Sequence, residues 1–128
     1  MQFTQQNTAG ANLIRRYGAD FVTVGEVDIR SSCLVTASTL TTDWQPSTVD
    51  ELARAHLDAL FALAPEVIVL STGVQQRFPR AALRAEFATR KIGLEVMEVG
   101  AACRTYNVLV AEQRKVLAAI LLPRVRPG

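Results

Sequence analysis

The sequence has few of the residues on which most metal and catalytic sites depend. Its 128 residues include one histidine, His56, and two cysteines, Cys33 and Cys103, which lie far apart and form no CxxC unit. His56 alone cannot build a metal site, so we expect none, and we interpret both cysteines as free buried thiols in a reducing compartment. The motifs GxGxxG, Walker A, GxSxG and HExxH are also missing. The sequence therefore indicates no cofactor and does not support an enzyme.

A strong excess of charge and a long apolar run are missing as well. The 14 basic and 12 acidic residues leave a formal net charge of +2, and the basic residues are scattered, which argues against nucleic-acid binding. The longest apolar run, 116–122, is too short to span a bilayer. The polar segment 1–8 lacks the apolar stretch of a secretory signal, and the two arginines before Asp20 are too few for a mitochondrial presequence. We therefore expect a cytoplasmic protein rather than a mitochondrial one.

What the sequence does contain is the pattern of one α/β domain. A chain of this length with 49% apolar residues can bury a single core. We predict a polar lead-in over 1–11, one domain over 12–123 and a short tail over 124–128. In the first third, runs rich in Val, Ile and Thr predict antiparallel strands joined at one point by the two-residue turn Gly25-Glu26. These strands cover 13–17, 21–24, 27–30 and 33–37.

From Thr48 onward the pattern alternates between helix and strand. Thr48 and Glu51 fit a capping box, which predicts a helix that begins there and ends before Pro65. Later helices are predicted over about 80–90, with Gly93 as the C-cap, and from about residue 101. Apolar runs predict strands over 67–70, 94–99 and 116–122.

This order of elements predicts a three-layer α/β domain. Its central sheet is mixed and mostly parallel, with helices on its faces, and the N-terminal strands add an antiparallel β layer. Because the connection before 116–122 is short, we expect that last strand at the margin of the sheet in an antiparallel direction.

Polar side chains gather after two of the predicted parallel strands. The first group is Ser71, Thr72 and Gly73, and the second is the run Cys103, Arg104, Thr105, Tyr106 and Asn107. Ligands bind beyond the carboxyl ends of strands in open α/β sheets, so the two groups predict one cleft suited to an anion or a carboxylate. The competing interpretation is structural. On that view Thr72 and Gly73 shape a turn, Arg104 pairs with Glu98 or Glu112, Tyr106 lies in the core and Asn107 satisfies backbone groups.

Two further residues have alternative interpretations. Cys103 near a helix N-terminus and beside Arg104 could be a nucleophile, but no base accompanies it, so we favour a buried structural residue. Trp44 joins the β-rich third to the helical part, where it is either a core residue or an exposed anchor for a partner.

The segment Ala102 to Leu109, followed by Glu112 and Arg114, resembles the signature of the Mth-like domain family of unknown function. Further matches are Trp44 with Pro46, Ser71-Thr72-Gly73, Gly93 to Met97 and Val116 to Pro123. That family includes the mitochondrial respiratory complex I assembly factor 3 and the adipogenesis-associated Mth-like protein. The resemblance implies a three-layer fold with a mixed sheet and no established reaction, and its best-understood member binds proteins during assembly of a membrane enzyme. Ser71 departs from the family, which more often has glycine there, and would narrow the cleft.

The sequence and the resemblance together predict a non-enzymatic protein-interaction domain similar to assembly factors, with an unidentified protein partner. The alternative is a small-molecule or anion-binding module, an enzyme included, that uses the cleft between Ser71–Gly73 and Cys103–Asn107. A third option is a homodimer formed through an apolar sheet face or through Trp44.

Overall fold

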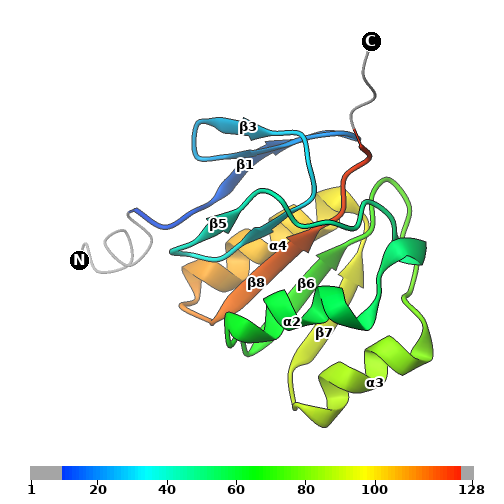
Figure 1. The fold of residues 1–128 in the computed structure, drawn as a ribbon. Coiled ribbons are helices and arrows are strands. Elements are labelled where there is room, and N and C mark those ends of the chain that lie inside the picture. Colours follow the sequence, from blue (N-terminus) through cyan, green and yellow to red (C-terminus); the bar gives the residue numbers. More distant parts are fainter. Residues whose placement is uncertain (1–9, 125–128) are drawn as a thin grey trace.

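The computed structural model describes residues 10–124 and has three layers (Figure 1). A three-stranded antiparallel sheet contains the first strands, β1 (Ile14–Tyr17), β2 (Val22–Val24) and β3 (Val27–Ile29). A five-stranded sheet forms the middle layer from β4 (Cys33–Val35), β5 (Leu40–Thr41), β6 (Val67–Ser71), β7 (Gly93–Met97) and β8 (Val116–Ile120). The helices are η1 (Val49–Glu51), α2 (Arg54–Ala62), α3 (Ala81–Thr89) and α4 (Val99–Ala111). The predicted mixed sheet and the additional N-terminal β layer are therefore confirmed, but the predicted strand 33–37 is β4 of the five-stranded sheet and does not belong to that layer.

The last strand lies inside the five-stranded sheet, not at its margin. The strand order is β5-β4-β8-β6-β7, in which β8 is parallel to β6 and antiparallel to β4. The predicted antiparallel strand at the margin is wrong because α4 alone makes the crossover. Its 13 residues span about 20 Å and return the chain to the amino end of the sheet, so a short connection suffices for a parallel strand. All five residues of β8 are buried, as expected for a strand covered on both faces.

Each face of the five-stranded sheet has its own apolar core. Alternate residues of β6 divide between them, with Val67 and Val69 on one face and Ile68 and Leu70 on the other. The first face packs against α4 and the three-stranded sheet, and the second against α2 and α3 (Figure 1). The side chains of α4 therefore point either into the first core or away from the sheet.

Only one of the two bonds of the predicted capping box forms, and it caps a shorter element. The Thr48 hydroxyl accepts the Glu51 amide at 3.3 Å, and the helix that it caps is the single 3₁₀ turn η1. The Glu51 carboxylate accepts the amide of Ser47 at 3.0 Å, one residue before the expected partner. The chain then extends for two residues and α2 begins at Arg54, where the His56 ring nitrogen Nδ1 accepts the Ala53 amide at 3.0 Å.

Gly93 does not cap α3. It is the first residue of β7, and the left-handed position after the helix is taken by Lys91 with φ +59°. The backbone amide of Gly93 instead donates to the carbonyl of Glu66 at 3.1 Å, so this glycine opens the parallel pairing of β7 with β6.

The predicted domain limits, 12 and 123, stay predictions, because residues 1–9 of the lead-in and 125–128 of the tail lie outside the described residues. Within 10–124, no helix combines the length and apolar character that crossing a bilayer requires.

Candidate functional site

The two segments predicted to form a cleft do meet at the carboxyl ends of β6 and β7. These strands are parallel neighbours, with Ser71 paired to Met97. The Thr72 amide donates to the Met97 carbonyl at 2.9 Å, and the Val99 amide donates to the Gly73 carbonyl at 2.8 Å. The two segments are therefore adjacent, as predicted. Whether they can bind a ligand depends on the contacts that their side chains make.

The amino end of α4 already holds a carboxylate of this chain. Glu98 is the N-cap, and its oxygens accept the amides of Gly100 at 2.8 Å and Ala101 at 2.7 Å. These two bonds, the Ala101 bond first, together with the charge of Arg104, lower the pKa of Glu98 below its ordinary value. An external anion at this helix end would have to displace Glu98.

Arg104 pairs internally, as the structural interpretation predicted. Its guanidinium lies 4.0 Å from the Glu98 carboxylate and donates to the Tyr17 hydroxyl of β1 at 2.9 Å. A Cβ atom at Gly100 would lie 2.9 Å from that hydroxyl and 3.1 Å from Arg104, so glycine is required for this close approach. The Arg104 side chain nevertheless stays 66% exposed.

Cys103 is a buried structural residue. It is 1% exposed in the core between α4 and the sheet. Burial, aided by the charge of Glu98 and opposed by Arg104, raises the pKa of Cys103 to about 12. Burial and the nearby Cys103 likewise raise the pKa of Cys33 to about 12. Both cysteines are free, and a nucleophile needs the opposite shift. The burial of Cys103 supports the structural interpretation of this thiol.

Tyr106 and Asn107 attach α4 to the N-terminal segment. The fully buried Tyr106 donates its hydroxyl to the Asn12 carbonyl at 2.7 Å. The Asn107 side chain accepts the Ile14 amide and donates to the Ile14 carbonyl, each at 2.9 Å. One amide group thus satisfies both backbone groups of a residue in β1, which confirms the structural interpretation. Thr105, between Arg104 and Tyr106, is half-buried.

Thr72 and Gly73 shape a turn after β6. The Thr72 hydroxyl donates to the Gln75 carbonyl at 2.6 Å and accepts the Arg77 amide at 3.1 Å. Gly73 has φ +100°, a backbone conformation that favours glycine. Ser71 is fully buried, and within residues 10–124 its hydroxyl has no hydrogen-bond partner. We have no physical account of that unpaired hydroxyl.

Trp44 belongs to the second core. It is 7% exposed, packs with the apolar residues of α2 and α3, and donates its indole N–H to the His56 carbonyl at 3.2 Å. The core interpretation is therefore correct, and the alternative of an exposed partner anchor is contradicted by burial.

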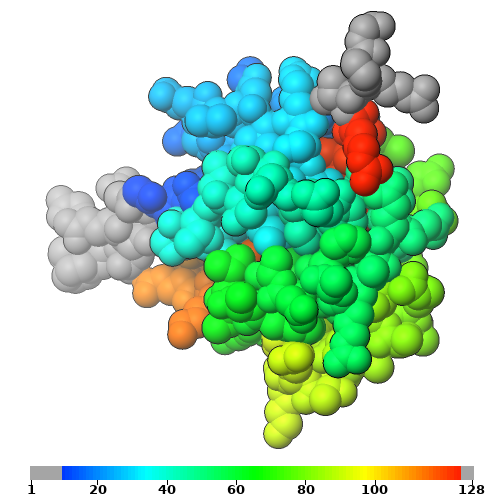
Figure 2. All heavy atoms as spheres, in the orientation of Figure 1, coloured from blue at the N-terminus to red at the C-terminus, as the bar shows by residue number. Residues whose placement is uncertain are grey.

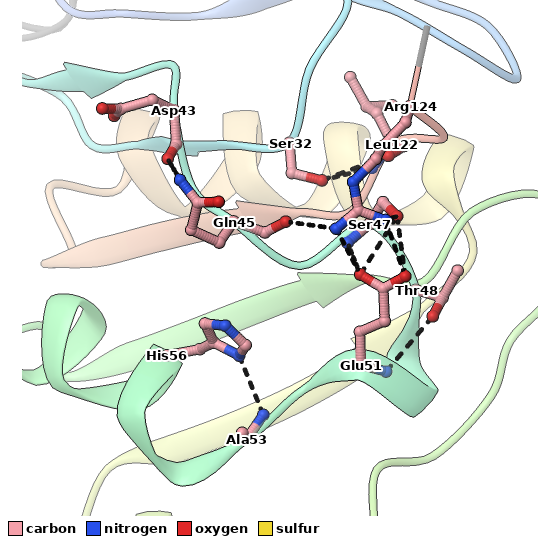
Figure 3. A network of polar contacts seen from close by, with 10 residues as sticks. All are labelled: Ser32, Asp43, Gln45, Ser47, Thr48, Glu51, Ala53, His56, Leu122 and Arg124. Carbon is pink, nitrogen blue, oxygen red and sulfur yellow. Dashed lines mark hydrogen bonds and ion pairs between the residues drawn. The ribbon is translucent and has the colours of Figure 1, made fainter. Parts of the chain in front are cut away.

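A cleft that the sequence analysis missed lies at the carboxyl end of β8 (Figure 3). Its volume is about 390 Å³, and Trp44, Ser32, Asp43, Leu122 and Arg124 are among its lining residues. The Ser32 hydroxyl accepts the Leu122 amide at 2.9 Å and so fixes the end of β8 to the residue before β4. The rule that ligands bind beyond strand ends would have indicated this place if β8 had been predicted in the centre of the sheet.

Arg124 closes one side of this cleft. Its two guanidinium nitrogens donate to the two carboxylate oxygens of Glu51, both at 2.8 Å, and one of them also donates to the Ser47 hydroxyl at 2.9 Å (Figure 3). The Arg124 bond first, and the Ser47 amide second, lower the pKa of Glu51 to about 2. This arginine is therefore engaged by a carboxylate of the chain itself. Within residues 10–124, no group of three or more His, Cys, Asp or Glu side chains is placed to hold a metal ion.

The loop between β6 and α3 is the other feature that the sequence analysis left without a role. Two large apolar side chains stand out from it, Val74 with 68% of its surface exposed and Phe78 with 61%. The loop runs along the margin of the molecule beside β7, where the Gln76 side chain donates to the Val96 carbonyl at 2.8 Å (light green in Figure 1). Figure 2 shows the same segment at the right margin of the molecular surface.

Known proteins similar to this chain include two named curated relatives. A protein of Francisella tularensis subsp. holarctica (strain LVS) named 13 kDa major membrane protein is 33% identical over 73 residues, which cover 57% of this chain and 59% of that protein. The NADH dehydrogenase [ubiquinone] 1 alpha subcomplex assembly factor 3 of Danio rerio is 32% identical over 82 residues, which cover 62% of this chain and 47% of that protein. The chain therefore spans between 47% and 59% of the length of these relatives.

Solved structures agree with the fold. An NMR structure from Xanthomonas campestris has a TM-score of 0.82 and 36% identity, covering 90% of this chain and 87% of that one. A Mth938-like domain from Bordetella pertussis is similar in fold, with a TM-score of 0.75 and 23% identity, covering 87% and 85%. A family model described as protein of unknown function (DUF498/DUF598) matches residues 14–121. The resemblance to Mth-like domains is thus confirmed, and the chain belongs to the DUF498/DUF598 family.

Proposed function

We propose that this chain is a non-enzymatic protein-interaction domain that acts as an assembly factor for a multisubunit respiratory enzyme. The observation that carries the proposal is the placement of its reactive and apolar side chains. Cys103, Tyr106 and Asn107 are committed to the core or to internal bonds, whereas Val74 and Phe78 stand exposed on a surface loop. Exposed apolar side chains suit contact with another protein better than they suit chemistry.

The similarity to the assembly factor of Danio rerio supports the kind of partner. That relative is named for NADH dehydrogenase, so we propose an incomplete NADH dehydrogenase subassembly as the partner of this chain. The similarity to a protein named as a membrane protein supports a membrane-bound partner, through which this chain would be held at the membrane. A cytoplasmic location stays a prediction, and so does a homodimer.

Deletion of the gene in the native organism tests this function. We expect incomplete NADH dehydrogenase subassemblies to accumulate on native gels, and NADH oxidation in membranes to fall, with both restored by the wild-type gene. A Cys103→Ala variant should restore them equally, since the thiol has no catalytic role in this account. Normal assembly in the deletion strain would contradict the proposal. Failure of the stably folded Cys103→Ala variant to restore assembly would point to chemistry at that thiol.

A second candidate function is binding of a small polar ligand. The cleft at the carboxyl end of β8 supports it, with a volume of about 390 Å³ and hydroxyl and guanidinium groups in its wall. Thermal-shift measurements with nucleotides, carboxylates and phosphates test it, because a ligand selective for the folded state raises the melting temperature. A shift abolished by Ser32→Ala and kept by the exposed control Ser38→Ala would favour this function. No shift with any of these ligands would count against it.

A further inference from the structure

We propose that the loop of residues 72–80 is the contact surface through which this domain binds its protein partner, and that it inserts Val74 and Phe78 into an apolar groove rimmed by acidic side chains. This inference rests on the proposed interaction function and adds to it the site and the chemistry of the partner.

The exposed side chains are presented by a loop whose backbone is fixed. The Thr72 hydroxyl ties its start to Gln75 and Arg77, and the Gln76 side chain ties its middle to β7. Pro79, next to the exposed Phe78, is buried against the second core. Because both ends are held, little conformational freedom remains to be lost when a partner binds, which favours affinity.

The charge around the two apolar side chains has one sign along the chain. Residues 72–85 contain three arginines, Arg77, Arg80 and Arg84, and no acidic residue. The Arg77 guanidinium forms an ion pair with the Asp50 carboxylate at 3.3 Å. The Arg84 guanidinium donates to the Pro79 carbonyl at 3.1 Å. Arg80, two residues after Phe78, is exposed. An apolar pair flanked by basic groups is complementary to an apolar groove with an acidic rim.

An anionic membrane surface also combines apolar groups with negative charge, but the observations favour a protein as the partner. Only two large apolar side chains protrude from this loop, and the whole chain carries a net charge of +2. Interfacial anchoring uses an extended apolar face and a large basic cluster, whereas residues 72–80 offer two apolar side chains and two arginines.

Site-specific photocrosslinking in the native cell tests the inference. p-Benzoylphenylalanine replaces Phe78 in one strain and Val108, a 55% exposed residue on α4, in a matched control strain. We expect a protein adduct from position 78 at a yield at least about tenfold above position 108. The crosslinked peptide of the partner should line an apolar groove with Asp or Glu at its rim. Equal yields from both positions, or a crosslinked groove without acidic residues, would overturn the inference.

A charge reversal sharpens the experiment. Arg80→Glu places a negative charge at the amino end of α3, where it does not threaten the helix, and should lower the adduct yield from position 78 at least about fivefold. Arg15→Glu on the exposed part of β1 changes the net charge equally and should leave the yield unchanged. Equal yields for both variants would contradict the acidic rim.

The remaining outcomes separate this inference from the proposed function. Adducts from position 108 without any from position 78 would leave an interacting protein but refute the loop as its contact. No protein adduct from either position, with normal NADH dehydrogenase assembly in the deletion strain, would refute both. Cosedimentation of the wild-type chain with vesicles containing 30% phosphatidylglycerol, lost in Phe78→Ser, would replace the protein groove by a membrane surface.

Discussion

Two segments of the molecule contrast in composition and in exposure. Residues 102–107 of α4 carry reactive groups that are mostly buried or bonded, whereas residues 74–78 of the loop after β6 carry apolar groups that are exposed. The helix segment contains a thiol, a phenol and a carboxamide, yet Cys103 and Tyr106 are buried and Asn107 is bonded to β1. The loop segment contains no group that suggests chemistry, yet it holds the two most exposed large apolar side chains among residues 10–124, Val74 and Phe78.

The difference teaches that polar groups next to a strand end do not by themselves indicate a binding site. On α4, Tyr106 and Asn107 bond to backbone groups of Asn12 and Ile14, so these polar groups attach the helix to the N-terminal segment. In the loop, the apolar side chains of Val74 and Phe78 are exposed to solvent, at positions where a polar residue would fit equally well. Substitutions in the helix segment should therefore change stability, and substitutions in the loop should change binding.

The largest expected effect concerns the thiols. Raising a pKa from 9.0 to about 12 lowers the thiolate fraction at pH 8 by a factor of about 1,000. We expect iodoacetamide to modify Cys33 and Cys103 of the native protein on the order of 100- to 1,000-fold more slowly than in guanidinium chloride, as measured by mass spectrometry of each cysteine peptide. Rapid modification of native Cys103 would show that α4 exposes a reactive group and would break the contrast with the loop.

Truncation of the buried phenol should give the largest loss of stability. Tyr106→Ala leaves a cavity between α4 and the sheet and an unpaired Asn12 carbonyl, so we expect a loss of about 3–5 kcal/mol in the free energy of unfolding. Phe78→Ala should change that free energy by less than about 0.5 kcal/mol, since the ring is exposed. Urea unfolding followed by circular dichroism measures both. Similar losses for the two variants would contradict the assignment of the loop to the outside.

Removal of the carboxamide that bonds β1 should have an intermediate effect. Asn107→Ala leaves the buried Ile14 amide and carbonyl without partners, which should cost about 2–3 kcal/mol. Amide hydrogen exchange of β1 should accelerate more than that of β8, because the lost bonds attach the N-terminal sheet to α4. A Thr105→Ala control on the same helix should be milder. Uniform acceleration across both sheets would show that Asn107 has no specific role in attaching β1.

The smallest expected effect is a pH dependence of stability that comes from the Glu51–Arg124 pair. The pKa of Glu51 is lowered from 4.5 to about 2 in the folded state, so its pair with Arg124 stabilises the fold above pH 4.5. That contribution is lost as the pH falls toward 2. Glu51→Gln should therefore be less stable than the wild type at pH 6, and the difference should shrink by pH 2. The effect is small because both side chains are exposed. A constant difference across this range would exclude the ion pair as its cause.

Much of the fold could be predicted because periodicity reports which residues are buried. The alternating elements from Thr48 onward and the antiparallel strands before it follow from local patterns. The position of β8 could not be predicted, since its apolar run fits a central or a marginal strand and only the length of α4 decides how the chain returns. The end of α3 was predicted correctly, but its cap was not, because Lys91 adopts a left-handed conformation that sequence rules assign to glycine.

Of the two interpretations of the site, the structural one agrees with the side chains of Cys103, Tyr106 and Asn107, and the choice between them could not be made from spacing. Spacing placed Cys103 to Asn107 on a helix correctly, but the face that meets the sheet depends on where β1 and β8 lie. The carboxylate at the helix end was also invisible, because Glu98 was predicted as part of a strand and is the N-cap of α4. The exposure of Phe78 beside the buried Pro79 has no signal in the sequence at all.

The comparison between helix segment and loop is tested most directly by one measurement on a Val74→Ser, Phe78→Ser double variant. NADH dehydrogenase subassembly retained by the tagged chain is quantified after purification from the native organism, with the free energy of unfolding as the control. We predict at least about a tenfold loss of the retained subassembly with stability unchanged within about 0.5 kcal/mol. Full retention by a stably folded double variant would contradict the account.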